Sequence, residues 1–183
     1  MTNVESLKDA LIDELKDLYS CETQILKALP AMEKKATNET LKGAFKKHLG
    51  ETEGQVERLK QISELVDEKL TGKVCKATQG LLEEGKDVLE SESPNPAIID
   101  TLLIGAARRV EHYEIAAYTC AIAMANACGE SKIAKILGMT LNEESKTDQG
   151  LSKIADSKVL ALAAEDTNQQ DEAVSHKKRA NER

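Results

Sequence analysis

The chain has 183 residues, of which 40% are hydrophobic and only 2% aromatic, enough for one domain with a sizeable core. Ala, Leu, Glu and Lys dominate and long β-branched runs are absent, so the composition predicts an all-α fold. A net charge of -7 argues against nucleic acid and anionic membrane surfaces as partners.

The cysteines and the N-terminus indicate the cellular compartment. No Cys-x-x-Cys motif occurs among the four cysteines, which are Cys21, Cys75, Cys120 and Cys128. Charged residues follow Met1 too closely for the apolar region of a signal peptide. The longest uncharged run, residues 115–129, is shorter than the ~20 residues that span a bilayer. We therefore expect a cytoplasmic protein with reduced thiols and no membrane partner.

A first helix is predicted over about residues 6–36. Its buried stripe has one gap of seven residues, and the apolar positions are Leu11, Leu15, Leu18, Ile25 and Leu29. Glu22 stands in the middle of this gap, where the helical period places an apolar residue. Because Pro30 removes one backbone hydrogen bond, we expect the regular helix to kink or end there.

A second helix is predicted from its N-cap at Asn38. Its stripe alternates spacings of four and three through Leu41, Phe45, His48, Thr52, Gln55, Leu59, Ile62 and Val66. The stripe is apolar at both ends and polar in the centre, and Glu51 follows His48 by three residues. The second helix therefore repeats the pattern of the first.

The segment from Leu70 to Pro96 is the one long connection in the chain. Residues 74–89 within it predict one or two short helices, with Gly80 and Gly85 as interruptions. A connection of this length lets the chain cross from one end of a bundle to the other.

The third predicted helix has Asn95 as N-cap and Pro96 at its first position, and Gly129 suits the position after its end. Its long uncharged run is typical of a helix inside a bundle. Glu111 and Glu114 lie just before this run and, three residues apart, share one face. Burying two carboxylates is costly unless cations or hydrogen-bond donors compensate them.

The fourth predicted helix starts near Ser131. Its stripe is again spaced by four and three, through Ile133, Leu137, Thr140, Glu144, Thr147, Leu151 and Ile154. Glu144 is its central member, and Asp148 follows four residues later on the same face. The pattern weakens after residue 157. We therefore divide the chain into a bundle domain, residues 1–157 with the crossover at about 70–95, and a polar C-terminal extension, residues 158–183.

Carboxylates thus stand at mid-length in all four long helices, and in an antiparallel bundle these mid-points meet in one layer. That layer would hold Glu22, Glu51, Glu111, Glu114, Glu144 and Asp148, with His48 and Gln55 nearby. The nearest cations are one or more turns away, so bound divalent ions are the simplest compensation. Oxygen-rich ligands with little imidazole and no thiolate suit iron or manganese better than copper or zinc. Two ions bridged by carboxylates would use the ligands best.

These features resemble the ferritin-like superfamily and, within it, the YciE/YciF-type stress-associated proteins. The similarity covers about residues 4–157. It is carried by Leu18-Tyr19-Ser20-Cys21-Glu22, His48-Leu49-Gly50-Glu51-Thr52, the run from Val110 to Tyr118, and Leu141-Asn142-Glu143-Glu144 with Asp148. The resemblance implies a four-helix bundle made of two up-down hairpins joined by a long crossover with short helices. It also implies metal-ligand positions at Glu22, Glu51, Glu111, Glu114 and Glu144.

The sequence departs from the superfamily pattern at two histidines. The pattern has Glu-x-x-His on the second and fourth helices. Gly54 and Thr147 stand at these two histidine positions instead. His48 lies on the other side of the second-helix Glu, and Asp148 is one residue beyond the usual ligand.

Simpler roles stay open for several residues. The two acids of the third helix could form a surface patch paired with Arg108, and His48 could be a core histidine hydrogen-bonded to a neighbouring Glu. Gln55 and Asp148 are equally well explained as polar neighbours of a site. His112 points roughly 100° away from Glu111, which favours a packing role. The three tyrosines, Tyr19, Tyr113 and Tyr118, are most simply core aromatics.

Two functions from different classes of protein follow. The first is a metal-binding protein whose iron (di-iron) or manganese site carries out stress-related redox chemistry with oxygen or peroxide, as a di-iron oxidase or peroxidase does. The second is a non-enzymatic, dimeric helical stress protein with a polar core and a vestigial or structural metal site. We expect a homodimer in either case, because Ala-rich faces of the third helix can pack closely.

Overall fold

The computed structural model describes residues 4–165, and all regular structure within that range is helical. The helices are α1 (Leu7–Lys35), α2 (Glu39–Val66), α3 (Lys76–Glu90), α4 (Pro96–Ala127) and α5 (Ser131–Ile154). A π-helical turn, η1 (Ala155–Val159), extends α5. The expected all-α fold is confirmed. The polar end of the predicted C-terminal extension, residues 166–183, lies outside the described residues.

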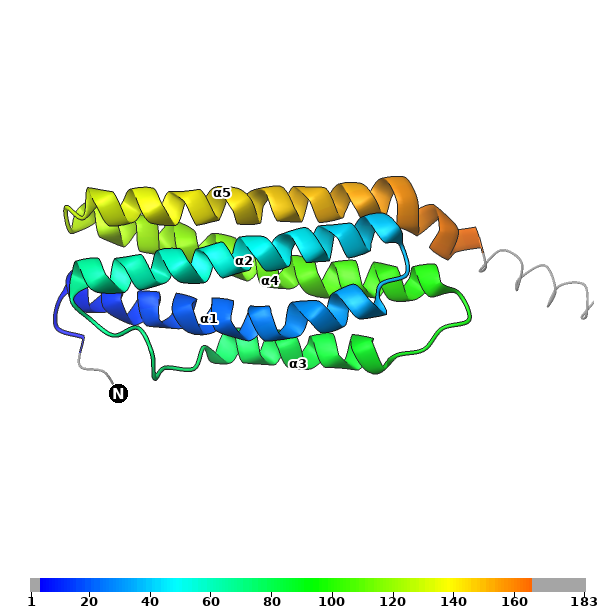
Figure 1. The fold of residues 1–183 in the computed structure, drawn as a ribbon, viewed down its shortest axis with the longest axis horizontal. Coiled ribbons are helices and arrows are strands. Elements are labelled where there is room, and N and C mark those ends of the chain that lie inside the picture. Colours follow the sequence, from blue (N-terminus) through cyan, green and yellow to red (C-terminus); the bar gives the residue numbers. More distant parts are fainter. Residues whose placement is uncertain (1–3, 166–183) are drawn as a thin grey trace, which may run out of the picture.

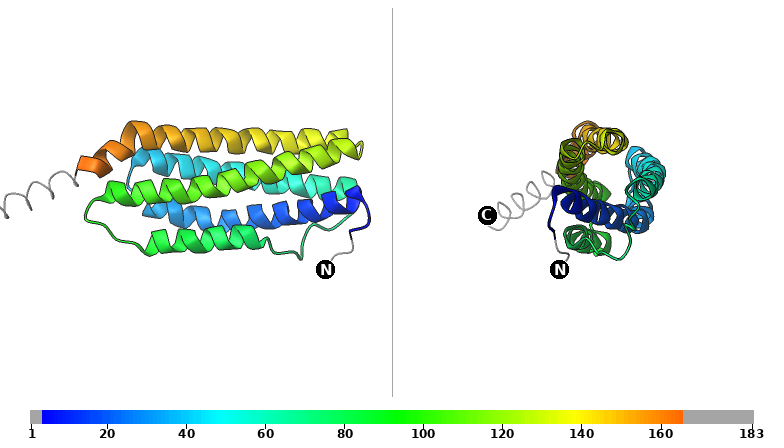
Figure 2. Two further views of the ribbon diagram at one scale, coloured as in Figure 1. Left: turned by 180° about the vertical axis from the view of Figure 1, so that it is seen from behind. Right: turned by 90° about the vertical axis from the view of Figure 1, so that its left-hand side faces the viewer.

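Four of these helices form a bundle of two hairpins, α1 with α2 and α4 with α5 (Figure 1). The end-on view in Figure 2 shows these four helices around a shared core, with α3 outside the ring. α3 packs against α1 and α4 and carries the chain back along the bundle to the start of α4. The predicted order of two up-down hairpins joined by a long crossover is therefore confirmed.

The crossover contains one helix where one or two were expected. Gly80 and Gly85 lie inside α3 instead of interrupting it. A helix-interior glycine costs roughly 1 kcal/mol relative to alanine but does not forbid the helix. α1 likewise continues through Pro30 to Lys35, so the helix does not end at the proline.

Two apolar clusters occupy the two ends of the bundle core. One is built around Leu29, Leu41, Phe45, Ile99, Leu103 and Leu151. The other is built around Leu11, Leu15, Leu59, Ile62, Ile133 and Leu137. Burial of apolar surface contributes roughly 25 cal/mol per Å², so these clusters hold the four helices at a fixed depth. The polar mid-helix residues lie between them.

Side-chain caps fix where the helices start. Asn38 Oδ1 accepts hydrogen bonds from the backbone N–H groups of Thr40 and Leu41, and Asn95 Oδ1 accepts from Ala97. Both predicted N-caps are therefore confirmed. Gly129 follows α4 with a φ of 77°, the left-handed conformation that glycine adopts without strain.

A buried carboxylate ties α4 to the turn between α1 and α2. Asp100 Oδ1 accepts from Thr37 N–H at 2.8 Å, and Oδ2 accepts from Asn38 N–H at 2.9 Å and from the Thr37 hydroxyl at 2.7 Å. The carboxylate therefore satisfies backbone donors just before α2 begins and also joins the two hairpins.

Asp100→Asn should lower the free energy of unfolding by about 2 kcal/mol, because an amide donor would replace an oxygen that accepts buried hydrogen bonds. Urea unfolding measures the change. The matched control is Asp87→Asn on the exposed side of α3, which should stay within about 0.5 kcal/mol of wild type. Equal losses in the two variants would contradict the role of Asp100.

Candidate metal centre

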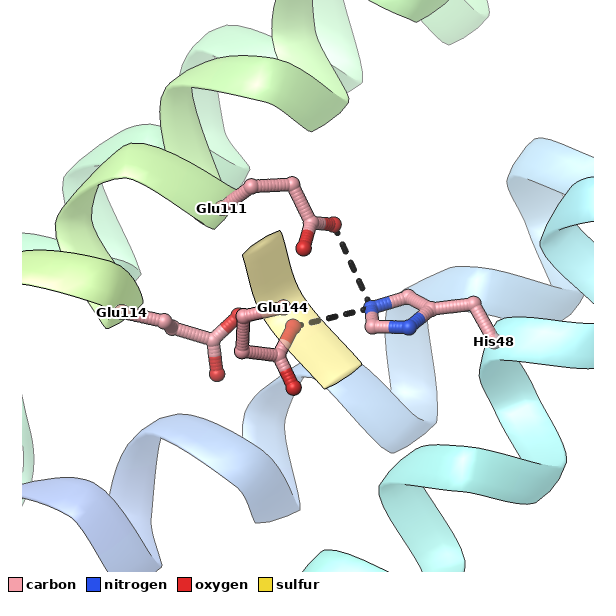
Figure 3. A group of neighbouring side chains, drawn as sticks. All are labelled: His48, Glu111, Glu114 and Glu144. Carbon is pink, nitrogen blue, oxygen red and sulfur yellow. Dashed lines mark ion pairs between the residues drawn. The ribbon is translucent and has the colours of Figure 1, made fainter. Parts of the chain in front are cut away.

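Four buried side chains converge at mid-depth in the bundle. His48 from α2, Glu111 and Glu114 from α4, and Glu144 from α5 each offer one ligand atom, and these atoms lie within 4.8 Å of one another (Figure 3). We call these four residues the carboxylate cluster. Helical geometry explains part of the arrangement, since Glu111 and Glu114 are three residues apart and share the inner face of α4.

The histidine is the single imidazole of the cluster. His48 Nε2 lies 3.3 Å from Glu111 Oε1 and 3.9 Å from Glu144 Oε2, although neither contact has the geometry of a hydrogen bond. On the other side of the ring, Nδ1 lies 3.4 Å from the Thr147 hydroxyl. Thr147 stands where the ferritin-like pattern has the histidine of the fourth helix. Its hydroxyl contacts the His48 ring instead of supplying a second imidazole.

Neutral donors surround the carboxylates. The Gln55 amide donates to Glu144 Oε1, and the Tyr118 hydroxyl donates to Glu22 Oε1. The Cys21 thiol donates to Glu114 Oε1 at 3.6 Å. None of these donors carries a positive charge, so they orient the carboxylates without neutralising them.

The nearby arginines pair with other acids. Arg58 makes a two-pronged contact to Glu143, at 2.7 and 2.6 Å, and Arg108 Nε lies 2.7 Å from Asp148 Oδ1. These contacts bind the charges at the rim of the bundle. Within the described residues, His48 is therefore the nearest group that could supply positive charge to the cluster.

Burial raises the pKa of the acids in this layer. Loss of hydration raises the pKa of Glu111 to about 7 and that of Glu144 to about 9, and the negative charge of Glu111 adds to the shift at Glu144. Burial first, and neighbouring acids second, also raise the pKa values of Glu22 and Glu114 well above the usual range. Without a bound cation, the layer therefore favours protonated carboxyl groups.

Unsatisfied atoms mark the same layer. Within residues 4–165, the buried side-chain nitrogen and oxygen atoms that lack a hydrogen-bond partner belong to Glu22, His48, Glu51, Gln55, Glu111, Glu114 and Glu144. Buried polar atoms in folded proteins are usually paired, and each unpaired atom costs about 1–3 kcal/mol. These carboxylate and imidazole atoms are the donor set that iron or manganese accepts, so the residues present fit such an ion.

The predicted residues outside the cluster differ in position. Glu22 is fully buried beside it, and Gln55 contacts it through Glu144. Glu51 reaches the rim, where one oxygen pairs with Lys47 and the other is buried without a partner. Asp148 faces Arg108 and His112 instead of the cluster.

The sequence pattern did not show that Tyr118 and Cys21 contact acids of this layer, as both do. Tyr118 is a core aromatic, as the sequence predicts, and its side chain is fully buried. Its position four residues after Glu114 places it on the same inner face and was the available signal. All four cysteines are free thiols, as expected.

Comparison with known proteins agrees with this architecture. A family described as "Domain of unknown function (DUF892)" matches residues 6–164. Protein YciF from Escherichia coli (strain K12) is 42% identical over 154 residues, covering 84% of this chain and 92% of that protein. The crystal structure of the E. coli stress protein YciF matches with a TM-score of 0.79 and 41% identity, over 82% of this chain and 95% of that one.

Two further solved structures are similar. The protein YcfI from Rhodopseudomonas palustris is 36% identical, with a TM-score of 0.79 over 84% of this chain and 98% of that one. A protein from Xanthomonas campestris is 20% identical, with a TM-score of 0.70 over 88% and 99% of the two chains, and it shows the same fold.

A four-helix bundle of two hairpins joined by one long crossover has the ferritin-like fold. The chain belongs to the YciF-type family of stress proteins, matched over most of its length. The described residues contain no helix that is long and apolar enough to cross a membrane.

The metal-free protein should lose stability as the pH rises. The folded-state pKa values of Glu111 and Glu144 are about 7 and about 9, above the ordinary value of 4.5. Between pH 4.5 and these raised values, the folded chain therefore binds more protons than the unfolded chain. We expect the free energy of unfolding to fall by about 2 kcal/mol or more from about pH 5 to about pH 9.

Urea titrations of chelator-treated protein across this pH range measure the effect. Glu144→Gln removes a carboxyl group whose pKa is raised to about 9 and should flatten the profile. A stability that rises with pH in the metal-free wild type would contradict the protonated layer.

Proposed function

We propose that this protein binds iron or manganese in the carboxylate cluster and uses it in redox chemistry with peroxide or oxygen. The observation that carries the proposal is the set of unpaired buried atoms. They concentrate on the acids, the histidine and the amide that converge at mid-depth, and no Lys or Arg within residues 4–165 is buried there to pair with them.

His48, Glu111, Glu114 and Glu144 would hold the first ion. Glu22 and Glu51 each have a buried oxygen without a partner, so they are the candidates for completing a second position. A redox-active ion held by these residues would supply Lewis acidity and electron-transfer chemistry.

The chain's own residues would prepare this centre. The Tyr118 hydroxyl and the Gln55 amide fix the orientation of Glu22 and Glu144. The Thr147 hydroxyl contacts His48 Nδ1 and leaves Nε2 directed at the cluster. Such contacts hold a ligand in place before the ion arrives. The apolar clusters at the two ends exclude water from the layer.

Metal content tests the proposal directly. We expect wild-type protein reconstituted with iron(II) or manganese(II) to retain metal after gel filtration, and to melt at a higher temperature than the metal-free form. The double variant Glu111→Gln/Glu144→Gln keeps the shape of both side chains and should lose most of the bound metal. Elemental analysis and thermal unfolding provide the two measurements.

The matched control is Glu53→Gln, which changes an exposed glutamate on α2 and should bind metal as the wild type does. Peroxide consumption by the loaded proteins should follow the metal content. Wild type without metal, or a double variant with full metal, would contradict the proposal.

A second function is favoured by one observation. Glu111 and Glu144 both lie against His48 Nε2, and burial raises the pKa of both, so a protonated, cation-free layer can hold the core together. The protein would then be a non-enzymatic stress protein, and the relative YcfI is itself provisionally described as structural. In that case, adding or removing metal should leave the melting temperature unchanged at neutral pH.

The homodimer remains a prediction. Exposed apolar side chains on α4, Ile98 and Leu102, give it a surface that a second copy could cover. Ile98→Glu/Leu102→Glu should give a monomer in light scattering if the wild type is a dimer through this face.

A further inference from the structure

A second polar group continues outward from the carboxylate cluster. The Cys21 thiol, which donates to Glu114, also accepts from the Thr78 hydroxyl at 2.9 Å. The same hydroxyl oxygen lies 3.3 Å from Cys75 Sγ. The two sulfurs therefore approach one hydroxyl from α1 and from the start of α3, next to a cluster ligand.

Backbone contacts hold the two cysteines together. The Cys75 N–H donates to Ser20 Oγ at 2.9 Å, and the Cys75 carbonyl accepts from the Gln24 amide at 3.2 Å. Ser20 and Gln24 flank Cys21 on α1. The backbone of Cys75 is thus fixed against the turn of α1 that carries Cys21, although the two residues are far apart in the sequence.

The environment of this pair differs from that of the other cysteines. Cys21 and Cys75 are 0% and 2% exposed, whereas Cys120 is exposed and Cys128 half-buried. A half-buried tyrosine on α4, Tyr113, contacts Cys75 Sγ through its hydroxyl at 2.9 Å. Oxidants in solution react poorly with buried thiols, but an oxidant at the carboxylate cluster would be one ligand away from Cys21.

We propose that Cys21 and Cys75 are a redox-active dithiol that reduces a peroxide bound at the carboxylate cluster. This inference rests on the proposed metal-dependent redox function. Two S–H bonds break and one S–S bond forms, so the sulfurs lose two electrons. These electrons cleave the O–O bond of hydrogen peroxide, and the two thiol protons complete two molecules of water. The Cys21 proton starts toward the cluster along its hydrogen bond to Glu114 Oε1.

The Thr78 hydroxyl contacts both sulfurs, so closing the disulfide would change both of these contacts. Thr78 is the buried residue of α3, which otherwise packs on the outside of the bundle through half-buried side chains. Such a weakly anchored element opens locally at a lower free-energy cost than a bundle helix. Cys75 stands just before α3, so a small shift of this helix changes the approach of the two sulfurs.

The test uses the full chain loaded with iron(II), with hydrogen peroxide as oxidant. Free thiols are alkylated after denaturation, and linked peptides are identified by mass spectrometry. In the loaded wild type we expect the number of free thiols to fall from four to two, with Cys21 joined to Cys75. The metal-free protein should react at least about tenfold more slowly, because its thiols are buried.

Cys75→Ser keeps a hydrogen-bonding group near Thr78, away from the cluster ligands, and should bind metal as the wild type does but form no such link. Cys120→Ser is the matched control and should still form it. If the loaded protein consumes peroxide while Cys21 and Cys75 stay reduced, the dithiol proposal alone is wrong. If the chain binds no metal, both proposals fail. Equal rates of disulfide formation with and without metal would overturn the link to the cluster.

Discussion

The structure depends on the desolvation of several acids at one depth in the bundle. Glu22, Glu114 and Glu144 are almost completely buried, and the nearest arginines are paired with Glu143 and Asp148. A buried carboxylate must be protonated, paired or bound to a cation. Protonation corresponds to the raised pKa values, and cation binding would use the same carboxylate oxygens as ligands. The fold therefore keeps its centre in a state that protons and metal ions compete to occupy.

Apolar burial at the two ends of the bundle offsets the free-energy cost of burying the central carboxylates. Each end cluster draws residues from all four bundle helices and fixes their relative depth. Without them, repulsion between carboxylates would separate the helices at mid-length. The Asp100 contacts add a second constraint by joining α4 to the turn between α1 and α2. The rigid ends thus maintain a polar middle that would not assemble by itself, as functional sites built on rigid elements require.

Much of this arrangement was predictable from the sequence, because helical periodicity reports which residues share a face. Glu22 and Glu144 stand at positions of regular stripes where apolar residues are expected, and both are buried in the structure. Periodicity is less informative at the edge of a stripe. Glu51 and Asp148 lie near the same faces, yet a carboxylate at the edge of a stripe can pair with a cation at the rim, here Lys47 and Arg108. Only tertiary contacts decide between these orientations.

The contacts of the crossover were outside the reach of the sequence pattern. The sequence predicts helix over residues 74–89. Their apolar residues do not indicate, however, which bundle helices this segment packs against. Cys75 precedes α3 in an irregular segment, where no period places its side chain, so its approach to Cys21 was not predictable. The same holds for the contact of Cys75 with Tyr113.

Because α3 lies outside the four-helix ring, it should open locally more readily than the bundle helices. Thr78 is the one buried residue of this helix and is small, whereas every helix of the ring has several buried apolar side chains. The backbone amides of α3 should exchange with deuterium through partial openings that leave the remaining helices assembled. The crossover connects the two hairpins, and its local opening would also give solvent access to the bundle interior.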